Sequence, residues 1–314
     1  MPHPEIDLNK VRTYSVFKRK SKVEISGLAR VVGQKADLDI LLKSLPKILK
    51  ASDFNLLVSQ IISARRKKRG IICLFGAHLV KCGLSPILID LLENRFVTHL
   101  ATNGAGAIHD LELAYWGKTS EEVEEGLKSG MFGMARETAE KFNSCSELAD
   151  LEEIGLGEAV GLKIIKDKCR YRKYSLLASA QKLKVPATVH VALGTDVVHQ
   201  HPSFKPYQTA EASFRDFKIL CQSVKSLNRG GVVINIGSAV VLPEVFLKAL
   251  SVARNVYGRI DDFTAANFDM NLQYRPLTNV VQRPTSGSGR GLNFVGHHEI
   301  MIPLLAAALK SKSA

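Results

Sequence analysis

Short apolar segments alternate with helical patterns along most of this chain, and this alternation constrains the fold more than any other feature. Runs of apolar and β-branched residues, bounded by glycine, proline or polar residues, occupy positions 71–75, 96–101, 185–192 and 232–236. Such runs are typical of strands that are buried on both faces. The pattern predicts an α/β protein in which helices cover both faces of a parallel sheet.

Helical patterns also fill the segments outside the predicted strands. Apolar residues at helical spacing predict two helices within residues 36–69, a mostly helical excursion over 117–156 and a closing helix over 300–309. We expect residues 1–60 to form an N-terminal helical layer and residues 61–314 to form the α/β domain.

The composition is that of a globular protein with a large core, since 46% of the 314 residues are hydrophobic and 23% are charged. No apolar run reaches the roughly 18 residues that a membrane helix needs, and the first ten residues lack the layout of a secretion signal. We therefore expect a cytoplasmic protein without a membrane partner. Five cysteines without a C-x-x-C pair predict reduced thiols.

A net charge of +13 favours an anionic partner, which leaves an acidic protein or an anionic small molecule open. The densest basic cluster, residues 65–69, precedes the first predicted strand and fits the carboxyl end of a helix. No nucleic-acid-binding motif accompanies it, so we expect no nucleic-acid partner.

A glycine-rich turn at residues 101–110 joins a predicted strand to a predicted helix. Few side chains stand between its backbone N–H groups and an approaching phosphate, and the following helix adds its positive end. A plain structural turn is the alternative, because the glycines do not complete the dinucleotide fingerprint.

Small and polar residues recur where the predicted strands end, at the sheet edge where parallel α/β folds bind ligands. They are Gly76-Ala77-His78, Thr102-Asn103-Gly104, Gly194-Thr195-Asp196, Gly237-Ser238-Ala239, the segment 264–269 and Gly296-His297-His298-Glu299. Several such ends in one chain predict a nucleotide-like ligand.

These segments also resemble, in the same order, the motifs of one enzyme family. Residues 77–83 are similar to S-N-L-x-S-S-G, 102–110 to T-T-A-G-G-x-E-E-D, and 185–196 to I-P-V-F-x-P-A-L-T-D. Residues 236–241 are similar to L-G-G-G-x-x, 263–269 to N-T-A-Q-E-F-D, and 296–305 to A-D-A-S-L-x-F-P-L-L. The family is that of the deoxyhypusine synthases, and the resemblance covers about residues 70 to 310.

The resemblance implies a Rossmann-like fold that binds NAD, as a homotetramer with sites at subunit interfaces. By position it implies that the following residues contact the cofactor: His78, Thr102, Asn103, Gly104, Asp196, Gly237, Ser238, Thr264, Ala265 and His297. Asp196 is suited to accept a hydrogen bond from a ribose hydroxyl, and Gly237 permits close approach of a dinucleotide.

Where the family carries the lysine that forms an imine with its substrate, this chain has Pro284. A proline cannot form a Schiff base, so this route is closed unless another lysine substitutes. The family's carboxylates for a polyamine are also replaced, at His201, Thr278 and Leu272, and only Glu244 remains near them. We therefore expect a small neutral or anionic substrate, favoured by His201 and by arginines at 275, 283 and 290.

Histidines are the best candidates for a general base near neutral pH. His201 is our first choice, followed by His199 and His109, with Glu244 as the remaining acid. Each of these histidines has an alternative role as a polar loop residue or a cofactor contact. We expect Trp116 to pack in the core or at an interface.

Two other sites are open alternatives. His190, Asp196, His199 and His201 include an H-x-H pair that would suit zinc or iron. The loop 285–291 would hold a phosphate through Ser286, Ser288 and Arg290, or is a surface loop without a ligand.

The function that fits these observations best is an NAD-dependent transferase or oxidoreductase that acts without a lysine imine. A nucleotide-binding or regulatory protein that kept the fold and lost the chemistry is the alternative.

Overall fold

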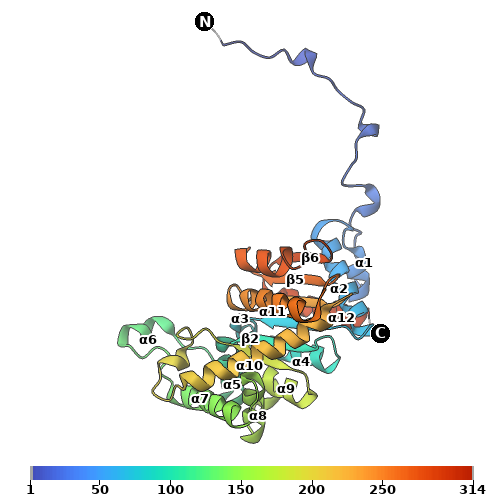
Figure 1. The fold of residues 1–314 in the computed structure, drawn as a ribbon. Coiled ribbons are helices and arrows are strands. Elements are labelled where there is room, and N and C mark those ends of the chain that lie inside the picture. Colours follow the sequence, from blue (N-terminus) through green and yellow to red (C-terminus); the bar gives the residue numbers. More distant parts are fainter. Residues whose placement is uncertain (1–2, 313–314) are drawn as a thin grey trace.

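The computed structural model describes residues 3–312, which contain one six-stranded sheet whose strands all run parallel (Figure 1). The strands are β1 (Ile71–Phe75), β2 (His99–Asn103), β3 (Ala187–His190), β4 (Val232–Ile236), β5 (Thr264–Asp269) and β6 (Arg290–Val295). Their order, β3-β2-β1-β4-β5-β6, is that of doubly wound dinucleotide-binding sheets. The predicted α/β class and the parallel, Rossmann-like sheet are confirmed.

Helices flank the sheet and connect its strands. The α-helices are α1 (Leu38–Ser44), α2 (Leu49–Arg66), α3 (Ala77–Lys81), α4 (Ser85–Glu93), α5 (Gly104–Trp116), α6 (Val123–Ser129), α7 (Arg136–Leu151), α8 (Leu156–Lys166), α9 (Leu176–Leu183), α10 (Pro206–Val224), α11 (Val241–Tyr257) and α12 (His298–Ser311). Shorter turns are η1 (Leu8–Lys10), η2 (Val16–Lys18), η3 (Ile25–Gly27), η4 (Arg172–Tyr174), η5 (Val197–Gln200), η6 (Lys225–Leu227) and the π-helical η7 (Pro276–Gln282). Within residues 3–312, no helix is both long and apolar enough to cross a membrane.

Alternation along the strands builds two hydrophobic cores. Side chains of β1 such as Phe75 face a core with α2, α4, α5 and α12, whereas Leu74 faces a second core with α10 and α11. Because both faces are covered at the centre of the sheet, β1 is apolar throughout and β4 at every position but Asn235, and both strands are fully buried. This explains why the sequence pattern predicted strands buried on both sides.

The strand boundaries differ from the prediction in three places. The run 96–101 lies partly in the approach to β2, which begins at His99, and the run 185–192 shortens to Ala187–His190. Residues 264–269, expected just after a strand, are β5 itself. Phe96 and Val97 are buried although they precede the strand, so apolar character alone does not mark where a strand begins.

The N-terminal segment is helical only in its second part. Residues 3–36 contain three short 3₁₀ turns and no buried residue, and Figure 1 shows them leading away from the sheet. The two helices predicted for residues 36–69 are present as α1 and α2, and α2 packs against the sheet across the expected boundary at residue 60. The division into two domains stays a prediction.

Candidate functional site

The glycine-rich turn between β2 and α5 is shaped by contacts within the protein. Asn103 caps α5 by accepting a hydrogen bond from the Gly106 N–H at 2.9 Å. A Cβ atom on Gly104 would lie 1.9 Å from the Asp196 carboxylate, and one on Gly106 would lie 2.1 Å from the Thr102 hydroxyl. A side chain at either position would therefore force Asp196 or Thr102 to shift.

Asp196 brings a negative charge to the amino end of α5. The Ala105 N–H favours the ionised form of this carboxylate, as expected at the positive end of a helix. The turn was expected to offer such N–H groups to a phosphate. One of them, the Gly106 N–H, already donates to Asn103, and the Asp196 carboxylate lies against Gly104 at the same helix end. Phosphate binding at this turn stays a prediction.

Asp196 also faces His199 across a short gap. The His199 Nδ1 accepts hydrogen bonds from the backbone N–H groups of Gly194 at 3.1 Å and of Asp196 at 3.3 Å, so the ring carries its proton on Nε2. That Nε2 lies 3.9 Å from the Asp196 Oδ2, which is too far for a hydrogen bond. Within residues 3–312 neither atom has a hydrogen-bond partner, although the side chains are only 4% and 7% exposed.

Burial explains the protonation equilibria of this pair. It raises the pKa of Asp196 to about 6, against the opposing effect of the Ala105 N–H, and it lowers the pKa of His199. A buried donor and a buried acceptor without partners are expensive to maintain in a folded protein. A hydroxyl group placed between them would satisfy both, since it accepts from Nε2–H and donates to Oδ2.

The pair borders two adjoining hollows. The main cavity, about 610 Å³, lies between α5, the segment 118–138 and the loop after β3. A side hollow of about 290 Å³ contains His199 and shares Phe132, Thr195, Asp196 and Val197 with the main cavity. The main cavity has the size of typical small-molecule sites.

A hydrogen-bonded cluster of α5 and its neighbours lines the main cavity. Glu112 accepts hydrogen bonds from the hydroxyls of Thr138 at 2.8 Å and of Thr119, and the Thr119 Oγ1 lies 2.6 Å from the His109 Nδ1. Burial opposes ionisation of Glu112, but the nearby His109 and the hydrogen bonds from the two threonines outweigh burial and hold the pKa of Glu112 below its ordinary value. The cluster therefore contains a half-buried carboxylate anion.

The charges on the cavity wall differ from those expected. The lining includes the carboxyl groups of Glu112, Glu121, Glu137 and Asp196 and the ammonium groups of Lys81 and Lys118. Neither His201 nor the arginines at 275, 283 and 290 contribute to it. The reason given for an anionic substrate is therefore wrong for this cavity, whose formal charge is negative.

The crevice between the ends of β1 and β4, where the strand order reverses, is filled by the protein itself. A Cβ atom on Gly76 would lie 2.3 Å from the Gly237 carbonyl oxygen, and one on Gly237 would lie 2.9 Å from the His298 ring. The buried His298 also packs edge-on against His78, with ring centroids 5.6 Å apart. Ser238 accepts from the Leu242 N–H at 3.2 Å. His78, Gly237 and Ser238 thus come together, but His298 lies where a dinucleotide was expected.

Two further predicted catalytic residues lie outside both hollows. The His201 Nδ1 lies 2.8 Å from the Ser203 hydroxyl and accepts from the Ser203 N–H at 3.1 Å, so it shapes its own loop. Glu244, on α11, accepts hydrogen bonds from Lys248 and from Asn279 at 2.8 Å. The hydrogen bond from Lys248 holds the pKa of Glu244 below its ordinary value. Neither group faces the ligand space.

The remaining predicted cofactor residues are also dispersed. Thr264 and Ala265 are the first residues of β5, at the amino edge of the sheet, because the expected strand end is the strand itself. His297 is the exposed N-cap of α12, with a side chain 66% exposed. Thr102 and Asn103 end β2, and Gly104, which begins α5, lies against the Asp196 carboxylate. Their contact with a cofactor stays a prediction.

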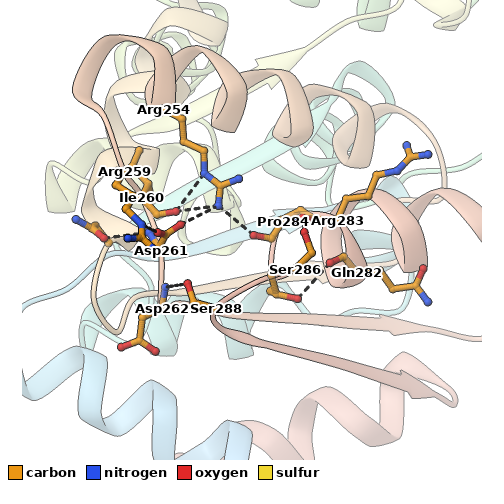
Figure 2. Close-up of polar contacts among 12 residues, drawn as sticks. Arg254, Arg259, Ile260, Asp261, Asp262, Gln282, Arg283, Pro284, Ser286 and Ser288 are labelled. Atoms are coloured by element: carbon orange, nitrogen blue, oxygen red, sulfur yellow. Dashed lines mark hydrogen bonds and ion pairs between the residues drawn. The ribbon is translucent and has the colours of Figure 1, made fainter.

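The alternative sites are not assembled. Within residues 3–312 no three His, Cys, Asp or Glu side chains lie close enough to hold a metal ion, and His190 instead lies 3.0 Å from the Thr188 hydroxyl. In the loop 285–291, the Ser286 hydroxyl donates to the Arg283 carbonyl, and the Ser288 hydroxyl accepts from the Asp262 N–H (Figure 2).

The position of the family's lysine is structural in this chain. The Pro284 carbonyl accepts from the Arg254 guanidinium at 3.1 Å, and the same guanidinium donates to the Ile260 carbonyl at 2.9 Å (Figure 2). The loop leads into Arg290, which begins β6 beside Thr264 at the amino edge of the sheet. This segment lies at the opposite edge from the hollows.

Comparison with known proteins supports the fold. No protein-family model matches the sequence, and no curated protein matches it. The structure is similar to that of an LOR/SDH protein from Methanococcus maripaludis S2, whose assignment is provisional, with a TM-score of 0.53 and 14% identity over 85% of this chain and 72% of that one. It is also similar to a provisionally named deoxyhypusine synthase from Entamoeba histolytica, with a TM-score of 0.52 and 11% identity over 89% and 95% of the two chains.

A third similar structure is that of AgrE in complex with ornithine and NAD⁺, with a TM-score of 0.54 and 12% identity. The match covers 83% of this chain and spans about a third of AgrE, namely 33%. At these identities the comparisons show a shared fold. The expected resemblance to deoxyhypusine synthase is therefore confirmed at the level of the fold.

The sequence interpretation missed most of the main cavity. Glu112, Thr119 and Thr138 were not singled out, and Trp116, expected in the core or at an interface, lines the cavity. The i, i+3 spacing of His109 and Glu112 on a predicted helix was the available signal, because residues three apart lie on one helix face. Nothing local indicated that Thr119 and Thr138 would close around them.

Proposed function

We propose that this chain binds NAD along the wall formed by Asp196 and His199, and that it uses the cofactor in a reaction on a small molecule held in the main cavity. The observation that carries the proposal is the pair of buried, unpartnered atoms, Asp196 Oδ2 and His199 Nε2, 3.9 Å apart on the boundary of two hollows. Both atoms are solvent-inaccessible in this structure, so a ribose hydroxyl would bridge them once the two side chains turn toward the hollows. Neighbours of this fold include AgrE, whose structure contains NAD⁺.

The residues around Asp196 fit the ribose of the cofactor better than its pyrophosphate. The Asp196 and His199 pair suits a ribose, and the two hollows together offer room on both sides of it. Asn103 already accepts from the Gly106 N–H, and the Asp196 carboxylate lies against Gly104, so a pyrophosphate at this helix end would meet the Asp196 charge. Lys81 and Lys118, on the cavity wall, are the cations placed to balance a phosphate. Bound NAD⁺ would supply a hydride acceptor.

The reaction does not use a lysine at the family's position. Pro284 lies in a turn at the amino edge of the sheet with its carbonyl held by Arg254. Lys81 and Lys118 are the two amines on the wall of the main cavity, and an imine would have to form on one of them. A nucleotide-binding protein without turnover is the second candidate, favoured by the loss of this lysine.

The chain's single tryptophan provides a direct test of binding, because Trp116 lines the main cavity. NADH accepts excitation energy from a nearby indole, so we expect saturable quenching of Trp116 emission and a matching calorimetric isotherm. Replacing Asp196 by Asn removes the acceptor for a hydroxyl and keeps an oxygen for the Ala105 N–H. We expect Asp196→Asn to weaken NADH binding about tenfold, equivalent to about 1.4 kcal/mol.

Asp262→Asn is the matched control, since that carboxylate is 66% exposed and lies beside Arg290 at the other edge of the sheet. It should bind NADH as the parent does. Equal affinity for the parent and Asp196→Asn, or no quenching at millimolar NADH, would refute the proposal. Conversion of NAD⁺ to NADH with any added metabolite would separate the enzyme from the second candidate.

A further inference from the structure

His109, Thr119 and Glu112 form a chain of hydrogen bonds whose protons can be assigned. Glu112 is ionised, so both of its oxygens are acceptors, and the Thr119 hydroxyl donates to one of them. The Thr119 oxygen is left with lone pairs only. Since the His109 Nδ1 lies 2.6 Å from this oxygen, Nδ1 must carry the proton and donate it. In the neutral ring the other nitrogen, Nε2, then has a free lone pair.

That lone pair faces the space in which we place the ligand. His109 lines the main cavity, and its side chain is 17% exposed. Its Nε2 has no hydrogen-bond partner within residues 3–312, and it is not among their solvent-inaccessible unpartnered atoms. Ala105, one turn earlier on the same helix, adjoins Asp196, so α5 presents both His109 and the Asp196 wall to one cavity.

The carboxylate is positioned to support a charged imidazole. The Glu112 Oε2 lies 3.7 Å from the His109 Nδ1, and Thr138 holds the other Glu112 oxygen at 2.8 Å. A proton arriving at Nε2 would create an imidazolium whose charge Glu112 offsets directly and through Thr119. This is the arrangement of a base oriented by a third group.

We propose that His109 is the proton acceptor of the main cavity, that Thr119 and Glu112 are its positioning residues, and that the substrate carries a hydroxyl or amino group directed at Nε2. In this step the O–H or N–H bond breaks, its electron pair stays on the substrate, and the new N–H bond forms at Nε2. The imidazolium later releases the proton to water. The inference rests on the proposed function only for the oxidant that would take the hydride; the state of His109 does not depend on it.

The test is the tautomer of His109, read by nitrogen-15 NMR of the full chain with labelled histidine. His109→Gln assigns the signals by removing them. We expect the Nδ1–H form in the parent chain and in Thr119→Ser, which keeps the hydroxyl. Thr119→Val and Glu112→Gln should both shift His109 toward the Nε2–H form. If Nδ1 does not donate to Thr119, the tautomer would be unchanged in these variants.

An Nε2–H tautomer in the parent chain, or an Nδ1–H tautomer that survives both Thr119→Val and Glu112→Gln, would overturn the proposal. Glu112→Gln keeps the test decisive if Thr119→Val fails to fold. His109→Gln should bind NADH within about twofold of the parent, because His109 is not part of the Asp196 wall, and any turnover should fall at least about a hundredfold. The Nδ1–H tautomer without NADH binding would mean that only the proposed cofactor is wrong.

Discussion

Gly104 has no side chain, and this lets the Asp196 carboxylate reach the amino end of α5. The carboxylate occupies the place where any other residue would carry its Cβ atom, 1.9 Å from Oδ2. The glycine that the sequence offered as a phosphate contact is therefore a packing requirement, and the anion it accommodates is part of the protein. Sequence inspection could locate the turn, but Asp196 is 92 residues away along the chain, so its contact with Gly104 could not be inferred from local pattern.

We expect Gly104→Ala to lower the free energy of unfolding by about 1–3 kcal/mol, as overpacking of a close contact does. Urea denaturation measures this difference. Gly33→Ala is the control, since a Cβ atom there meets nothing within 4 Å, and it should change stability by less than about 0.5 kcal/mol.

Repeating Gly104→Ala in an Asp196→Ala background shows whether the contact with Asp196 causes the loss of stability. With the carboxylate gone the collision disappears, and Gly104→Ala should then cost clearly less than in the parent chain. An equal loss in both backgrounds would mean that the Asp196 contact does not explain the glycine.

At the scale of elements, the side chains of α10 cover the edge strand of the sheet, β3. Its Asp216 accepts hydrogen bonds from the Val189 N–H at 2.7 Å and from the Gly157 N–H at 2.9 Å, which joins β3 to the start of α8. Ser213 on the same helix accepts from the Val191 N–H at 3.1 Å and donates to the Val189 carbonyl at 3.0 Å. Helix side chains thus replace the missing neighbouring strand, which protects an edge that would otherwise pair with another chain.

Burial raises the pKa of Asp216 to about 8, despite the hydrogen bonds from Val189 and Gly157. A folded-state pKa above the unfolded value means that ionisation is unfavourable in the folded protein, so the stabilising contribution is complete at low pH and is lost as pH rises. We expect the free energy of unfolding of the parent chain, relative to that of Asp216→Asn, to fall as pH rises from about 5 to about 8.5. The fall should be at least about 1.4 kcal/mol, which corresponds to a pKa shift of about one unit.

Urea unfolding of both proteins across this range gives the difference directly, and Asn does not titrate. If the parent chain instead became more stable relative to Asp216→Asn as pH rises, the N–H groups would hold Asp216 as an anion, with a pKa below its ordinary value.

At the scale of the whole molecule, the hollows do not lie at the point where the strand order reverses. The order β3-β2-β1-β4-β5-β6 places the reversal between β1 and β4, where such sheets bind dinucleotides. Here His298, from the last helix, covers Gly237 at that point. The hollows lie over α5 and the loop after β3, beneath the helical excursion that contains α6 and α7.

This offset predicts which substitutions change NADH affinity. His298→Ala removes the ring from the crevice, and we expect the Trp116 quenching constant to stay within about twofold of the parent, because the proposed ligand site lies one strand away. His298→Asn, which keeps a polar side chain near the Phe268 carbonyl, guards against loss of folding in the first variant. A change of more than about fivefold in both variants would place the ligand in the crevice between β1 and β4 instead.

By itself, the sequence determined the α/β class, the parallel sheet, the helices around it and the polar strand ends. Each of these follows from hydrophobic spacing over a few residues, which local geometry imposes directly. The tertiary structure alone decided which strand ends meet, that Asp196 occupies the amino end of α5, and that Thr119 and Thr138 close around Glu112. Those contacts join residues that are distant along the chain or carried by loops and helix ends, and their positions depend on how whole helices pack.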